Sequence, residues 1–180
     1  MKPIIAVLSV VILCIAIAAW VYLTRSNTPS DWTTFVSPEH DFELSAPGQL
    51  VSGKPAPDVV PTLQFQLTAS NNSYGIYFHV KRLDFPEKSI ADYPSAAFDS
   101  VRDTTVSTVH GRLISEVPIT LGDKHGREIR VSADGGKALA TQRMYIAADR
   151  LYIILAVRKP SEAADGAVLR FLDSFHFTRE

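Results

Sequence analysis

The sequence contains very little cysteine. Its 180 residues include a single one, Cys14, which lies in an apolar segment near the start of the chain. The rest of the chain therefore has no disulfide, no thiol nucleophile and no thiolate metal site. A domain without such cross-links depends on its hydrophobic core, and about 150 residues are enough to form one such core.

No charge of one sign predominates. The chain has 18 basic and 19 acidic residues, and 17 basic residues remain when Lys2, which precedes the apolar segment, is set aside. The part after that segment therefore carries a charge of about −2. It has no basic stripe and no recognisable nucleic-acid motif. These absences argue against nucleic acid as a partner.

Motifs that would identify an enzyme or a metal site are missing. The sequence has no Gly-x-Ser-x-Gly elbow, and Asp134-Gly135-Gly136-Lys137 lacks the Ser or Thr of a phosphate-binding loop. The histidines show neither HxH nor HExxH spacing, and we expect His79 on the polar side of its strand and His125 in a turn. We therefore predict a protein that is not an enzyme and has no catalytic, cofactor-binding or metal-binding residues. The other histidines are His40, His110 and His176.

One long hydrophobic run is present. Ile4 to Leu23 is interrupted only by Ser9, and 20 helical residues span about 30 Å, the thickness of the hydrocarbon core of a bilayer. Residues 1–23 are therefore predicted to form a single transmembrane anchor. The alternative is a signal peptide cleaved after the small-x-small pattern Ala16-Ile17-Ala18, but the apolar run continues beyond that point. A lipoprotein is excluded because the bulky Leu13 precedes Cys14.

The flanking charges suggest an orientation. Lys2 and the amino terminus favour a cytoplasmic start of the chain, although Arg25 on the other side reduces the asymmetry. We expect a single-pass protein of the cell inner membrane whose C-terminal domain is extracytoplasmic, with secretion after cleavage as the alternative. The polar residues 24–31 are predicted to be a linker, and residues 32–180 to be the domain.

Alternation of apolar and polar residues predicts a sheet-rich domain. Leu113, Ser115, Val117, Ile119 and Leu121 are expected on one face of a strand, and Asp134 to Lys137 is expected to turn a hairpin. Leu151 to Val157 is apolar without alternation, which is typical of a central strand covered on both faces. Pro47 to Pro61 is predicted to be a surface loop. The other expected strands are 33–36, 42–45, 63–68, 76–81, 127–133 and 139–147.

Two helices are expected. The first begins near Pro94 and ends near Ser107. The second follows Lys159-Pro160 with Ser161 as N-cap, and its apolar stripe is expected to be core: Val168, Phe171, Leu172 and Phe175. These elements predict an α+β domain, an α/β/α sandwich built on one mostly antiparallel sheet.

Several short stretches resemble a known family. Gly126-Arg127-Glu128, Arg143-Met144-Tyr145, Asp149 to Ile153 and Arg170 to Phe175 resemble small exported bacterial domains of the PsbP-like superfamily, similar to DcrB-like proteins. The resemblance implies an α/β/α sandwich and a non-enzymatic accessory or binding role. No manganese ligand set of the photosynthetic branch can be matched, so that role is not carried over.

The charged residues in these stretches have two interpretations. Arg127, Glu128, Arg130 and Arg143 fall on neighbouring predicted strands, where a cross-strand pair would help to set the register. A ligand site would be indicated if Arg143 lay in a concave pocket without a carboxylate partner. We expect a membrane-tethered binding or accessory module whose partners are the bilayer and a protein at the membrane. A structural subunit of a larger complex and a small enzyme assembled only by folding are the alternatives.

Overall fold

The computed structural model describes residues 32–47, 51–53, 63–71, 76–85, 90, 94–160 and 162–178. The predicted anchor (1–23), the predicted linker (24–31) and the predicted N-cap Ser161 lie outside these ranges. Among the described residues, no helix has the length and apolar character that crossing a bilayer requires.

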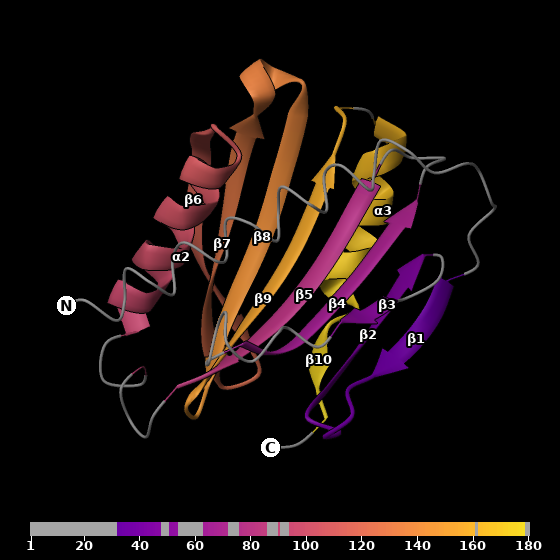
Figure 1. Ribbon diagram of the computed structural model, residues 1–180, viewed down its shortest axis with the longest axis vertical. Coiled ribbons are helices and arrows are strands. Elements are labelled where there is room, and N and C mark those ends of the chain that lie inside the picture. The colour runs from indigo at the N-terminus through magenta and orange to yellow at the C-terminus, as the bar shows by residue number, and fades with distance from the viewer. Residues whose placement is uncertain are drawn as a thin grey trace.

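The described part of the chain contains ten strands, two α-helices and one short 3-10 helix, η1 (Asp134–Gly136) (Figure 1). The helices are α2 (Pro94–Thr108) and α3 (Glu162–Asp173). The strands are β1 (Trp32–Val36), β2 (Phe42–Pro47), β3 (Val51–Gly53), β4 (Leu63–Asn71), β5 (Ile76–Asp84), β6 (Arg112–Leu121), β7 (Lys124–Ala133), β8 (Ala138–Ala147), β9 (Arg150–Arg158) and β10 (His176–Phe177).

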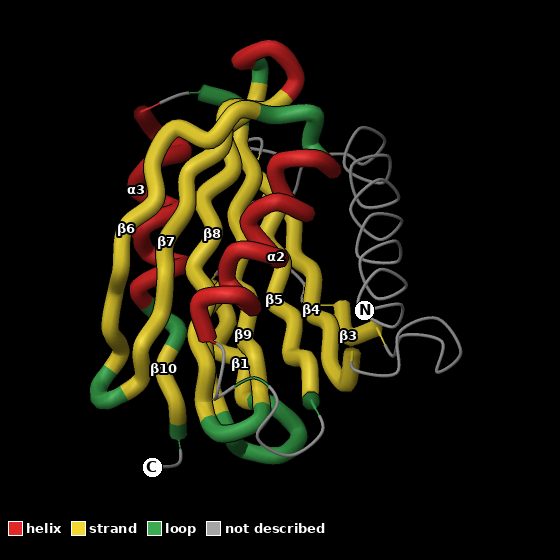
Figure 2. Tube along the Cα trace, turned by 90° about the vertical axis from the view of Figure 1, so that its left-hand side faces the viewer, coloured by secondary structure: helices red, strands yellow, loops and turns green. Residues whose placement is uncertain are grey.

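Seven strands form the main sheet, in the order β3-β4-β5-β9-β8-β7-β6. Every neighbouring pair is antiparallel. Helix α2 lies on one face of this sheet and α3 on the other, so we call these the α2 face and the α3 face (Figure 1, Figure 2). The predicted α+β class and helix-sheet-helix layering are confirmed.

The prediction of a single sheet is wrong. Strands β1, β2 and β10 form a separate three-stranded antiparallel sheet, the small sheet, which packs with α3 on the α3 face of the main sheet. Phe42 and Glu43 of β2 pair with the two residues of β10, more than 130 positions later in the chain. Local sequence patterns do not report such long-range pairing, because a two-residue strand has no periodicity to detect.

Two hydrophobic clusters cover the two faces of the main sheet. Alternate residues of β9 enter each cluster: Tyr152 and Ile154 lie among α3 and the small sheet, whereas Ile153 and Leu155 lie under α2. The prediction that β9 is a central strand covered on both faces is therefore confirmed. The predicted apolar stripe of the second helix is also confirmed as core, because its four members are at most 4% exposed: Val168, Phe171, Leu172 and Phe175.

The expected exposure of His79 is wrong. His79 and Lys81 alternate with apolar residues in β5, but they are only 2% and 4% exposed, because helix α2 covers their side of the sheet. Alternation predicts a strand with one solvated face only where no other element packs on that face. The sequence pattern correctly predicted the strand, but it did not reveal that a helix covers the polar side of that strand.

The apolar positions of β6 do not all share one face. The register with β7 shifts between Leu113 and Ser115, a β-bulge. Leu113 therefore packs into the cluster under α2, whereas Ile119 and Leu121 pack into the cluster on the α3 face. A bulge adds one residue to a strand and so reverses the side on which the following residues point.

The structure tests two of the expected turns and loops. The Asp134 to Lys137 segment turns the β7–β8 hairpin as predicted, and Gly135 and Gly136 have φ values of 63° and 94°, which glycine adopts without strain. The segment from Pro47 to Pro61 is not entirely loop, because Pro47 ends β2 and residues 51–53 form β3. Residues 48–50 and 54–61 lie outside the described residues.

Candidate binding surface

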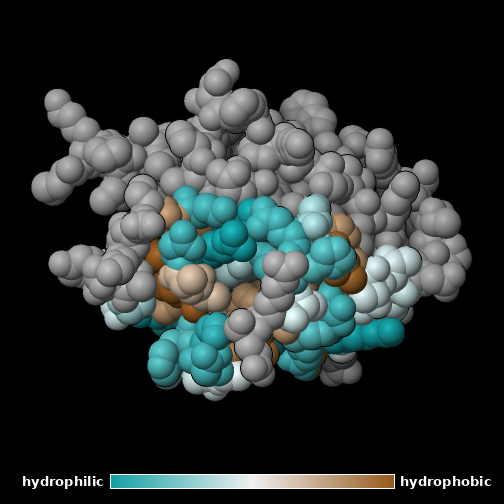
Figure 3. Space-filling model, turned by 90° about the horizontal axis from the view of Figure 1, so that it is seen from below, coloured by the Kyte–Doolittle hydropathy of each residue, from teal (hydrophilic) through white to brown (hydrophobic). Residues whose placement is uncertain are grey.

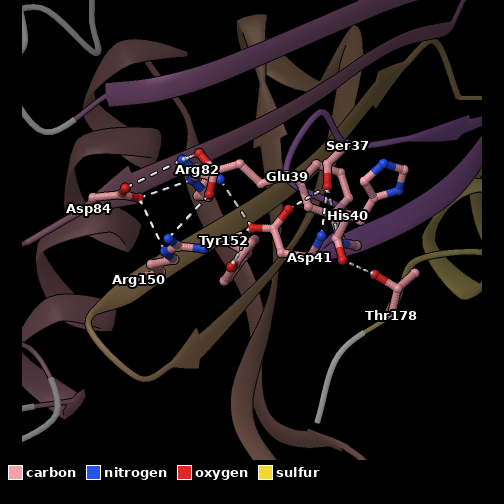
Figure 4. Close-up of polar contacts among 10 residues, drawn as sticks. Ser37, Glu39, His40, Asp41, Arg82, Asp84, Arg150, Tyr152 and Thr178 are labelled. Carbon is pink, nitrogen blue, oxygen red and sulfur yellow. Dashed lines mark hydrogen bonds and ion pairs between the residues drawn. The ribbon is translucent and has the colours of Figure 1, made fainter.

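A network of charged and polar side chains joins the small sheet to the main sheet (Figure 4). We call it the Asp41 network. It comes from the β1–β2 turn, the end of β5 and the start of β9, and its members are Ser37, Glu39, Asp41, Arg82, Asp84, Arg150 and Tyr152. Tyr152 pairs with Arg82 across β5 and β9, and Asp84 pairs with Arg150, so the sheet register brings these side chains together.

Asp41 is the centre of the network. Its carboxylate accepts hydrogen bonds from Ser37, from Arg82 (3.1 Å), from Arg150 (3.3 Å) and from the hydroxyl of Tyr152 (2.9 Å). Burial would by itself raise the pKa of Asp41, but the hydroxyls of Ser37 and Tyr152 and the charge of Arg82 outweigh it and lower the pKa. Burial and the bond to Asp41 both raise the pKa of Tyr152.

The outer members of the network complete the charge pairing. Glu39 binds Arg82 at 2.7 Å and Arg150 at 3.2 Å, and Asp84 approaches the same two arginines at 3.0 and 3.8 Å. Burial raises the pKa of Asp84, whereas the hydrogen bond from Arg82 lowers that of Glu39. Three carboxylates and two guanidinium groups thus pair their charges, although Arg82 Nε and Asp84 Oδ1 form an ion pair without hydrogen-bond geometry. Such mutual pairing is the arrangement of a structural clamp.

A second network fastens helix α2. Arg127 of β7 binds Asp99 of α2 at 2.6 Å and Glu116 of β6 at 2.5 Å, and Arg102 of α2 binds the same two carboxylates. The Arg127 guanidinium also lies 5.3 Å from the centre of the Phe98 ring, close enough for a cation–π contact. Arg127 therefore has a structural role on the α2 face.

Glu128, Arg130 and Arg143 lie on the opposite, α3 face. Glu128 is opposite Arg143 in the β7–β8 register and accepts from its Nε at 2.8 Å, so the predicted cross-strand pair is confirmed. Arg130 binds the same carboxylate at 3.2 Å, and Asp173 at the end of α3 binds Arg143 at 2.7 Å. Burial opposes the charge of Arg143, but Glu128 and Asp173 raise its pKa. Arg143 has two carboxylate partners, so the condition set for an anion site is not met.

A groove lies beside Arg143, between the end of β6 and the end of α3. We call it the β6–α3 groove; its volume is about 260 Å³. Polar and apolar groups contribute about equally to its exposed lining, and Arg143 and Asp173 form its polar end. The lining residues are Ile119, Thr120, Leu121, Arg143, Tyr145, Leu172, Asp173 and Phe175.

Gly126 shapes the floor of this groove. It pairs with both Ile119 and Tyr145 in the sheet, and a Cβ at this position would lie 2.4 Å from the Met144 carbonyl oxygen and 2.5 Å from the Tyr145 ring. The missing side chain therefore lets the Tyr145 ring lie across β7, where it stacks on Phe175 with centroids 5.9 Å apart. A glycine inside a strand commonly marks such a close approach.

Apolar side chains continue from the groove along β6. Val117 points to the same side as Ile119 and is 45% exposed, while Ile114, before it on the same strand, is 50% exposed. The other large apolar residues exposed in the described ranges are Val36 and Leu169. Seen from below, apolar surface is visible between hydrophilic side chains in the described part of the molecule (Figure 3). Exposed apolar surface rimmed by polar groups is typical of an interaction site.

The histidines do not converge. His40, His110, His125 and His176 are exposed on different turns and strands, and His79 is buried under α2. Within the described ranges, no group of three or more His, Cys, Asp or Glu side chains is arranged to hold a metal ion.

Sequence reasoning identified Arg143 as a residue to examine but missed the rest of the groove. Thr120, Tyr145 and Asp173 come from three distant elements, and no local pattern connects them. Gly126 in the interior of an otherwise regular strand is the signal that could have indicated the close approach at the groove floor.

Comparisons with known proteins support the fold. A scan against protein-family models and a search of curated proteins found no match. Among solved structures, the chain is similar to cyanobacterial PsbP from Synechocystis sp. PCC 6803, with a TM-score of 0.59 and 10% identity over 86% of this chain and 96% of that one. It is similar to the Ran-binding protein Mog1p of Saccharomyces cerevisiae, with a TM-score of 0.50 and 13% identity over 83% and 96% of the two chains.

A protein from Bacteroides thetaiotaomicron gives a TM-score of 0.52 at 9% identity, over 82% of this chain and 48% of that one. At identities this low the likeness establishes the fold alone. The chain therefore shares its fold with cyanobacterial PsbP, in agreement with the fold that the sequence resemblance implied.

Proposed function

We propose that this chain is a non-catalytic protein-binding module that the anchor predicted for Ile4–Leu23 tethers to the inner membrane, with the folded domain on the extracytoplasmic side. The β6–α3 groove, extended by the exposed Val117, is the observation that carries this proposal. An apolar side chain of a protein partner at the membrane inserts into this groove. The tether keeps the domain close to such a partner and so raises their effective concentration.

The chemistry of the described residues favours binding over catalysis. A volume of about 260 Å³ lies below the roughly 300–1,000 Å³ of most small-molecule sites, so the groove suits a side chain better than a whole substrate. The charged groups at its end, Arg143 and Asp173, bind each other, and Glu128 holds Arg143 from the other side. A general acid or base must reach the proton that it transfers, and these side chains are engaged in ion pairs with one another.

The geometry of β6 favours side-chain insertion over strand addition. β6 is an edge strand, which could in principle pair with a strand from another protein. The bulge after Leu113 twists this edge, and Pro118 has no N–H to donate. Both features are devices by which proteins protect sheet edges.

One fold neighbour is consistent with a binding role, because Mog1p is described as a Ran-binding protein. The partner of this chain has to be determined directly, because the two proteins share the fold at only 13% identity. The alternative is a structural subunit of a larger membrane complex. Such a subunit would bind its partner through the same surface, but the complex would be permanent.

The test uses the scarcity of cysteine. In the full chain with Cys14→Ala, Ser115→Cys, which lies beside Val117 on the groove side of β6, and Ser107→Cys on exposed α2 each place one thiol for a cross-linker. We expect membrane-dependent cross-links to a protein from Ser115→Cys and far fewer from Ser107→Cys. Adding Val117→Asp should abolish the Ser115→Cys product, because it places a charge beside the apolar part of the lining. Equal yields from the two positions, or an unchanged yield with Val117→Asp, would refute the groove as the binding surface.

Location requires its own measurement. Reporter fusions to the C-terminus should be active only outside the cytoplasm, and the protein should remain with the membrane after salt and carbonate washes. Cytoplasmic reporter activity would refute the proposed orientation, and mature protein beginning after Ala18 in the soluble fraction would refute the tether.

A further inference from the structure

A small cavity with a mainly apolar wall and a few polar side chains lies between α2 and the main sheet. Its volume is about 20 Å³. The cluster around it is built mainly of Ile, Leu, Met, Val and Phe, but four of the seven lining residues are polar. The lining consists of His79, Lys81, Val101, Thr105, Gln142, Ile153 and Leu155.

The strand register explains why these polar groups meet. His79 of β5 and Gln142 of β8 both lie opposite Leu155 of β9, from its two sides, so they flank it on the α2 face. Lys81 lies opposite the neighbouring Ile153. Helix α2 closes the cavity from above with Thr105, whose hydroxyl donates to Gln142 Oε1 at 3.0 Å.

Gln142 supplies a donor directed at this cavity. The residue is 2% exposed, and its Oε1 is engaged by Thr105, but its Nε2 has no hydrogen-bond acceptor among the described residues. A buried amide donor is costly unless it is paired, and most such groups in native proteins have a partner. The cavity next to Nε2 is the place where a partner fits.

The other polar groups favour the same kind of ligand. Burial and the nearby charge of Lys81 keep the pKa of His79 well below its usual value, so the ring is neutral and carries one N–H. Lys81, itself 4% exposed, also lines the cavity. The assignment of a ligand therefore depends on the amide donor of Gln142.

We propose that this cavity binds one small hydrogen-bond acceptor, a water molecule or a halide-sized anion, which accepts from Nε2 of Gln142. A single water needs about 10–15 Å³ and two to four polar partners, and the cavity provides the volume, the amide donor of Gln142 and the hydroxyl oxygen of Thr105. It excludes any larger organic ligand. The bound species links β8 to β5 beneath α2 and so helps to hold that helix on the sheet. This site is independent of the β6–α3 groove and of the proposed function.

Crystals of the protein grown with sodium bromide and with sodium gluconate provide the first test. We expect ordered density within hydrogen-bond distance of Gln142 Nε2 in both. An anomalous bromide peak identifies an anion, and oxygen-sized density without anomalous signal identifies a water. An empty cavity in both crystals, or Nε2 donating to a protein oxygen, would overturn the proposal.

Matched variants test the assigned donor. Gln142→Met keeps the length of the side chain and removes the donor, so the density should disappear. Thr105→Val frees the amide and should displace the density, whereas Thr104→Val is the control, because Thr104 is also buried but donates to the Ser100 carbonyl within its own helix. Each variant is first checked for cooperative unfolding. Density that is unchanged in Gln142→Met would overturn the assignment, as would displacement by Thr104→Val.

Discussion

The burial of His79 predicts a loss of stability in mild acid. The pKa of this residue in the folded protein lies well below the 6.5 of an unfolded chain, because burial and then Lys81 disfavour the charged ring. Below pH 6.5 the unfolded state therefore binds a proton that the folded state does not, and stability falls as the pH falls. The slope approaches 1.36 kcal/mol per pH unit, so one such histidine removes about 2 kcal/mol between pH 8 and pH 5.

Urea unfolding at a series of pH values measures this loss. The comparison is His79→Gln, which cannot titrate in this range, so its stability should be nearly flat between pH 8 and pH 5 even if it is lower throughout. His110→Gln is the control, because it removes an exposed imidazole after α2 instead of a buried one. Asp41 and Glu39 act in the same direction but at lower pH, because their unfolded values are 3.8 and 4.5.

The result that would refute the reasoning is a parallel loss of stability in the parent and in His79→Gln. Such a result would mean that His79 is protonated in the folded state. It would also remove the neutral ring from the cavity under α2.

Three other predictions concern local packing, ion pairing and the sheet edge. Gly126→Ala should destabilise the domain by about 1–3 kcal/mol, because its Cβ collides with β8, whereas Gly166→Ala in α3 meets nothing within 4 Å and should stabilise by about 0.5–1 kcal/mol; equal unfolding midpoints would contradict this. Asp41→Ala should cost about 1–3 kcal/mol in urea unfolding, because it leaves the buried Tyr152 hydroxyl without its acceptor and removes one of the three carboxylates around Arg82. No measurable loss would show that the network is not a clamp. Pro118→Val should promote self-association by restoring an N–H to the edge strand, and a monomer at high concentration in analytical ultracentrifugation would argue against edge protection.

Periodicity and turn chemistry in the sequence were sufficient to predict most of the elements and the layers. The apolar run from Leu151 to Val157 predicted a central strand, and β9 is the middle strand of the seven. The glycines after Asp134 predicted a hairpin turn, and the apolar stripe of α3 predicted its buried face. These features are local, because side-chain direction and backbone freedom depend on a few neighbouring residues.

Tertiary structure alone decided which surfaces are covered and which residues meet. Alternation in β5 could not reveal that α2 covers His79, and the bulge after Leu113 reversed the facing of the residues that follow it in β6. The β6–α3 groove and the Asp41 network join residues from distant parts of the chain. The physical reason is that burial and pairing depend on how elements pack, and packing is a property of contacts between segments that no single segment encodes.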